Sequence, residues 1–129
     1  MLTLNDYQQG ALGTAVYPGR GTTVGLIYVS EKLAGESGEF NEHFGKSLRD
    51  DGIVHDVQAL EDGSVTVRFG SVPSERTELL KKELGDVLWY IAAGAAELGV
   101  SLEEIAQANL DKLASRKARG VLGGSGDNR

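Results

Sequence analysis

Two segments of the chain each carry a pair of carboxylates spaced three residues apart. Glu36 and Glu39 form the first pair, and Glu83 and Asp86 form the second. On a helix this spacing places both side chains of a pair on one face. Four carboxylates brought together would repel one another unless a cation lay among them, and hard oxygen ligands suit Mg²⁺ or Mn²⁺. The two pairs therefore predict a divalent-metal site where the two helices meet.

The surroundings of both pairs depart from an ordinary solvated helix. Glu36 interrupts an apolar stripe, and the second pair borders another. Gly35, Gly38 and Gly85 lie beside the carboxylates, although a glycine inside a helix costs about 1 kcal/mol relative to alanine. Such departures often mark functional or close-packed sites, so the glycines could let two helices, or a ligand, approach closely. Acidic pairs are nevertheless common on solvated faces, and the residues alone leave both interpretations open.

Helical segments are expected to position these side chains. Apolar residues recur at helical spacing in three stretches, and a shorter helix is expected within residues 1 to 16. Ser101 and Glu104 form a capping-box pattern, and Gly99 suits a helix end. Phe40 and Phe44 are expected in the core. The three stretches run from about Thr23 to Leu48, from Ser74, a candidate N-cap, to Leu98, and from Ser101 to about Lys117.

Residues 53 to 69 instead predict a β-hairpin, because two β-branched runs flank Glu61-Asp62-Gly63. A three-residue loop with Gly63 in the left-handed region gives the better register. It places Asp56 opposite Arg68, a favourable cross-strand pair, and gathers apolar residues on the other face. The pairs expected on that face are Ala59 with Val65, Val57 with Val67 and His55 with Phe69.

The elements together predict an all-α fold, an antiparallel bundle of three to four helices with a small inserted β-hairpin. A chain of 129 residues fits one domain, which we assign to residues 1 to 119, followed by a glycine-rich C-terminal tail, residues 120 to 129. Helical chains of this size often complete their core by oligomerisation.

The composition of the chain limits its possible metal ligands and binding partners. Without cysteine, a metal must be held by oxygen or histidine ligands, and His43 and His55 are the only histidines. The net charge of −6 disfavours a nucleic-acid polymer or an anionic membrane as partner. A small anionic ligand remains possible, because a bound cation can reverse the local electric field. No apolar stretch is long enough to cross a bilayer, so a cytoplasmic protein is expected.

The ordered acidic pairs resemble those of the MazG-like, all-α nucleoside triphosphate pyrophosphohydrolases. The segments Glu36-Ser37-Gly38-Glu39 and Glu83-Leu84-Gly85-Asp86 are similar to the family's E-x-x-E and E-x-x-D pairs. The last helix and the glycine-rich end are similar as well. Two departures are a glycine, Gly35, where many members have a further glutamate, and the hairpin between the pairs. The missing glutamate could reduce the number of bound metal ions, and the inserted hairpin could change the substrate preference.

This resemblance implies a Mg²⁺-dependent enzyme, with Mn²⁺ as a possible substitute. It would hydrolyse ribo- or deoxyribonucleoside triphosphates to the monophosphate and pyrophosphate, and so sanitise the nucleotide pool. Glu36, Glu39, Glu83 and Asp86 would be the catalytic residues that hold the metal, and one of them could act as general base instead. Family members form dimers or tetramers, so a homodimer or homotetramer is expected.

Four further residues are expected to bind substrate. Asn109, Lys112 and Arg116 follow one side of the last helix and match the family's pattern, although basic residues also favour an ordinary helix end. Tyr90 lies four residues after Asp86 and could stack on a base.

Other assignments stay open. His43 lies four residues after Glu39 and could be a ligand, but we expect it to be solvated, and we expect His55 to be structural. A phosphoribosyl-ATP pyrophosphohydrolase would share the acidic pairs. A non-catalytic helical module could instead use them to bind a structural cation or a basic partner.

Overall fold

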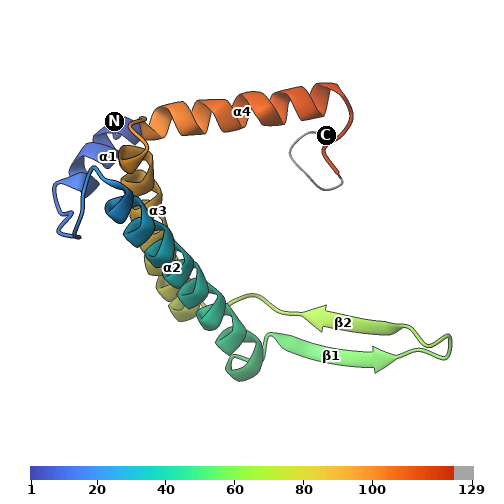
Figure 1. The fold of residues 1–129 in the computed structure, drawn as a ribbon. Helices are drawn as coiled ribbons and strands as arrows, with labels where there is room; N and C mark the ends of the chain where they lie inside the picture. The colour runs from blue at the N-terminus through green and yellow to red at the C-terminus, as the bar shows by residue number, and fades with distance from the viewer. Residues whose placement is uncertain (124–129) are drawn as a thin grey trace. The chain divides into compact units, whose positions relative to one another are not determined.

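Four helices and one two-stranded antiparallel sheet make up the computed structural model, which describes residues 1–123 (Figure 1). The all-α fold with an inserted hairpin is therefore confirmed. In the part of the chain described, none of the helices has the length and apolar character needed to span a membrane. The elements are α1 (Leu4–Leu12), α2 (Thr23–Asp50), β1 (Val54–Ala59), β2 (Val65–Phe69), α3 (Ser74–Glu97) and α4 (Leu102–Ala118).

The chain divides into two compact units, and both α2 and α3 run through the two. The first unit comprises residues 1–29 and 91–129, and the second comprises residues 30–90. Of the predicted C-terminal tail, residues 124–129 lie outside the described part.

α1 is anchored in the first unit by a buried glutamine. Its N-terminus carries a capping box between Thr3 and Asp6, and it ends at Leu12, earlier than the predicted limit of residue 16. The Gln8 side chain donates to the carbonyls of Ala92 and Val100, and its Oε1 accepts from the backbone N–H of Leu102. This amide therefore ties α1 to the turn between α3 and α4.

The ends of α3 and α4 follow the predicted local signals. Gly99 has φ +73°, where an L side chain is strained, and the Ser101–Glu104 capping box is present at the start of α4. Ser74 is the first helical residue of α3. The buried apolar side chains of this unit are mostly small: Ala15, Tyr17, Val29, Ala92, Ala93, Ala95 and Leu102.

In the second unit α2 and α3 run antiparallel. Arg76, near the start of α3, donates two hydrogen bonds to Asp51, just after α2, at 2.8 and 3.0 Å. The prediction that Phe44 lies in the core is wrong, since its exposed fraction is 41%, whereas Phe40 is half-buried. Within residues 30–90 the buried residues are Ser47 and Ile53, so this unit has little core of its own.

The hairpin keeps the predicted loop and most of the predicted register. Its three-residue loop ends with Gly63 at φ +83°, and Asp56 pairs with Arg68. The predicted pairing of His55 with Phe69 is wrong, because a bulge between Val54 and Asp56 sets Val54 opposite Phe69. Ile53, just before β1, is buried, with an exposed fraction of 4%.

Candidate metal centre

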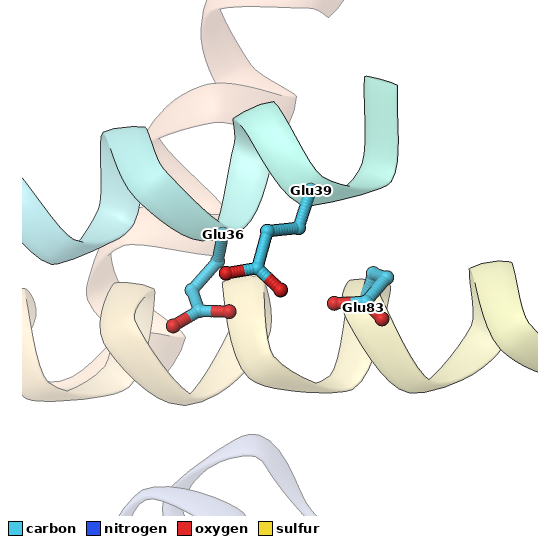
Figure 2. A group of neighbouring side chains, drawn as sticks. All are labelled: Glu36, Glu39 and Glu83. Atoms are coloured by element: carbon cyan, nitrogen blue, oxygen red, sulfur yellow. The ribbon is translucent and has the colours of Figure 1, made fainter. Parts of the chain in front are cut away.

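Three of the four predicted metal ligands come together in the second unit. Glu36 and Glu39 project from α2, and Glu83 projects from α3 (Figure 2). Each offers a carboxylate oxygen, and these oxygens all lie within 4.8 Å of one another. The spacing of three on α2 and the antiparallel pairing of α2 with α3 produce this geometry.

The pKa of Glu36 is affected by its position in this cluster of carboxylates. Burial raises the pKa of Glu36 above its ordinary value, and the negative charges of Glu39, Asp86 and Glu83 raise it further. Lys32 acts in the opposite direction. Burial is the largest cause of the shift, and the neighbouring carboxylates add to it.

Asp86, the fourth predicted ligand, lies beside the cluster. Its side chain is exposed, and it is not one of the three residues whose oxygens meet. The negative charge of Asp86 contributes to the raised pKa of Glu36. An all-oxygen donor set that lacks thiolates fits a hard cation such as Mg²⁺ or Mn²⁺.

The glycines beside the carboxylates do not mediate close helix packing. A Cβ atom built on Gly35, Gly38 or Gly85 would meet nothing within 4 Å. The expectation that they bring the two helices together is wrong within this chain. They leave open space on the helices beside the cluster, which is compatible with the other expectation, the approach of a ligand.

His43 lies closer to the site than its predicted role implies. Its Nε2 is 3.4 Å from Oε1 of Glu83, and its side chain is 25% exposed. The expectation of a solvated histidine is therefore wrong. The signal was present in the sequence as the spacing of four from Glu39.

The predicted substrate-binding residues divide between the two units. Tyr90 is half-buried at the end of the second unit, and its ring meets Trp89 edge-on at 4.8 Å. Asn109 and Lys112 are exposed on α4, and Arg116 on the same helix is 6% exposed. These three belong to the first unit, and their role toward the carboxylates stays a prediction.

Comparison with known proteins identifies the family of this chain. The profile of the MazG nucleotide pyrophosphohydrolase domain matches residues 28–121, which include both acidic pairs. The chain therefore belongs to the MazG nucleotide pyrophosphohydrolase family. It is 44% identical over 126 residues to the Gene 37 protein of Mycobacterium phage L5, a match that covers 95% of this chain and 96% of that protein. No solved structure matches the chain.

Proposed function

We propose that this protein is a Mg²⁺-dependent nucleoside triphosphate pyrophosphohydrolase that removes surplus or non-standard nucleotides. The observation that carries the proposal is the meeting of Glu36, Glu39 and Glu83, with oxygens within 4.8 Å of one another, inside the matched family domain. Such a carboxylate group is costly without a cation. Mn²⁺ would substitute for Mg²⁺ because it takes the same oxygen ligands.

In the proposed reaction, water attacks the α-phosphorus and the bond to the bridging oxygen breaks. The products are a nucleoside monophosphate and pyrophosphate, and the proton of the water passes to a base. A bound Mg²⁺ would neutralise the triphosphate charge and lower the pKa of a bound water. Glu36, Glu39, Glu83 and Asp86 would supply the ligands of the cation, except that one of these carboxylates could instead take the proton as general base.

Further side chains are proposed to orient the nucleotide. Lys112 and Arg116 carry positive charge suited to phosphate oxygens, and Asn109 on the same helix can hydrogen-bond a phosphate, sugar or base. Tyr90 offers an aromatic face for the base. The same proposal places the enzyme in the cytoplasm, where nucleoside triphosphates are used.

We also propose that the functional form is a homodimer or homotetramer. Phe44 and Leu48 on α2 and Leu84 on α3 have exposed fractions of 41%, 40% and 51%. At the base of the hairpin, an apolar groove of about 450 Å³ is lined by Phe44, Leu48, Ile53, Phe69, Gly70 and Val72. Large apolar side chains that a chain leaves exposed can be covered by a second copy of that chain. Light scattering should give two or four times the chain mass of 13.7 kDa, and a monomer at micromolar concentration would contradict this assembly.

The activity is tested by pyrophosphate release from a panel of ribo- and deoxyribonucleoside triphosphates. Each nucleotide is tested with Mg²⁺, with Mn²⁺ and with chelator. Glu83→Gln removes a cluster charge, and Glu78→Gln is the matched control, because Glu78 lies on the same helix and pairs with Lys81 in solvent. We expect metal-dependent formation of monophosphate by the wild type and Glu78→Gln, and loss in Glu83→Gln. No release from any nucleotide by folded, metal-loaded protein would overturn the proposal.

A further inference from the structure

His43 makes a contact between the two helices that carry the cluster. It lies on α2 one turn after Glu39, and its Nε2 is 3.4 Å from Oε1 of Glu83 on α3. Both side chains are largely withdrawn from solvent, with exposed fractions of 25% for His43 and 13% for Glu83. The imidazole therefore lies against the one carboxylate that α3 contributes to the group of three.

The orientation of the ring follows from this contact. A carboxylate accepts hydrogen bonds, so the contact of His43 Nε2 with Glu83 Oε1 is favourable when Nε2 carries the hydrogen. The other nitrogen, Nδ1, is buried and has no hydrogen-bond partner among the described residues. A solvated histidine would keep water on Nδ1. The polar interaction that the structure gives this ring is thus directed at Glu83.

We infer that His43 is a positioning residue that holds the Glu83 carboxylate toward Glu36 and Glu39. The inference rests on the metal site proposed above. Glu83 extends from α3 toward α2, and the contact of its carboxylate with His43 would restrict the rotamers that turn it away. Carboxylates that ligate metals are themselves hydrogen-bonded, and loss of such a partner typically costs 10- to 100-fold in metal affinity.

A role as a direct ligand fits the geometry less well. The oxygens that lie within 4.8 Å of one another belong to Glu36, Glu39 and Glu83, and among the described residues no nitrogen joins that group. His43 instead contacts a single one of these carboxylates, at Nε2. The arrangement is that of a residue acting through Glu83.

The test measures binding of Mn²⁺ alone to the full chain, by titration calorimetry and by the paramagnetic resonance spectrum of the bound ion. His43→Leu removes the donor at similar volume, and His43→Gln places an amide N–H near the former Nε2. The matched control is His55→Leu, because His55 is the other histidine and lies exposed on β1. Far-UV circular dichroism checks that each variant is folded.

We expect His43→Leu to bind Mn²⁺ about 10- to 100-fold more weakly, His43→Gln to recover most of the affinity, and His55→Leu to match the wild type. Unchanged Mn²⁺ affinity in His43→Leu would overturn the inference about His43 but would not contradict the proposed metal site. Failure of the rescue would also overturn it, since the loss of affinity in His43→Leu would then not come from a missing donor to Glu83. Absence of Mn²⁺ binding in the wild type would overturn the inference together with the proposed site.

Discussion

Glu97 and Glu83 are both glutamates of α3, yet their carboxylates meet very different neighbours. In the first unit Glu97 accepts a hydrogen bond from the Tyr17 hydroxyl at 2.5 Å and from the Gly21 backbone N–H at 2.9 Å. In the second unit Glu83 faces Glu36 and Glu39. The first carboxylate has donors for both of its oxygens, and the second is one of several acceptors that face one another.

The difference separates a structural carboxylate from one that we propose as a metal ligand. The loop before α2 is built around Glu97: Gly19 and Gly21 have φ +71° and +73°, and Tyr17, which donates to Glu97, stacks on Tyr28 at 5.5 Å. Donors of this loop satisfy both carboxylate oxygens of Glu97, so this carboxylate requires no further ligand. The acidic cluster brings several carboxylates together with His43 as one neighbouring donor, and a bound cation would balance the remaining negative charge.

The largest expected effect is the loss of activity in Glu83→Gln. Removal of one oxygen ligand should lower kcat/KM by at least about 100-fold, comparable to the loss of one group that stabilises developing charge. The stability of the metal-free protein should stay level or rise, because a repulsive charge is removed. In Glu97→Gln the pattern reverses, with lower stability and retained Mn²⁺ binding. Wild-type activity in Glu83→Gln would contradict the proposed difference in role between Glu83 and Glu97.

Added metal should stabilise the folded protein by binding to the acidic cluster in the second unit. Mn²⁺ at 100 times its dissociation constant is expected to raise the free energy of unfolding by about 2.7 kcal/mol, since it binds the folded state. Thermal unfolding with and without Mn²⁺ measures this shift. Glu36→Gln should reduce it, and Glu42→Gln, a solvent-exposed glutamate of the same helix paired with Lys46, should not. An equal shift in both variants would argue against the cluster.

Gly25→Ala probes the packing of the first unit. A Cβ atom there would lie 2.5 Å from the Gly19 carbonyl oxygen and 2.8 Å from Oε2 of Glu97. Because the nearer atom is backbone, the loop must move, and we expect a loss of about 1–3 kcal/mol in stability by urea unfolding. Wild-type stability would show that the loop around Glu97 is adaptable.

Tyr17→Phe tests the donor to Glu97. Burial raises the pKa of Tyr17 to about 12, and the hydrogen bond with Glu97 contributes to the same shift. Because the folded-state pKa lies above the ordinary value of 10, this stabilisation is fully present below pH 10 and is lost as pH rises through 12. At neutral pH the variant should lose about 1–2 kcal/mol. Urea midpoints from pH 9 to 12 should fall less steeply for Tyr17→Phe than for the wild type.

Local signals predicted much of this structure. The capping box at Ser101, the left-handed Gly63 and the spacing of Glu36 and Glu39 each depend on residues a few positions apart. The position of Glu83 beside that pair was also predictable, because the ordered pairs are a family pattern. Sequence and structure agree where a single turn or helix face decides the outcome.

The remaining features depend on tertiary contacts that no local pattern records. Tyr17 and Glu97 are 80 residues apart, and the His43–Glu83 contact requires a particular register between α2 and α3. Apolar spacing placed Phe44 on a stripe, but it could not show whether this chain alone covers that stripe. The bulge in β1 is likewise not recorded by the alternation of residues along the strand.

The smallest expected effect is a gain, in Gly38→Ala. Gly38 lies on α2 like Gly25, but a Cβ atom there would meet nothing within 4 Å. With no clash to oppose it, the helix preference of alanine should raise stability by up to about 1 kcal/mol in urea unfolding of the metal-free protein. Comparison with Gly25→Ala then isolates packing, since the two variants share a helix and a chemical change. A loss in Gly38→Ala as large as that in Gly25→Ala would mean that another copy of the chain fills the open space beside the carboxylates.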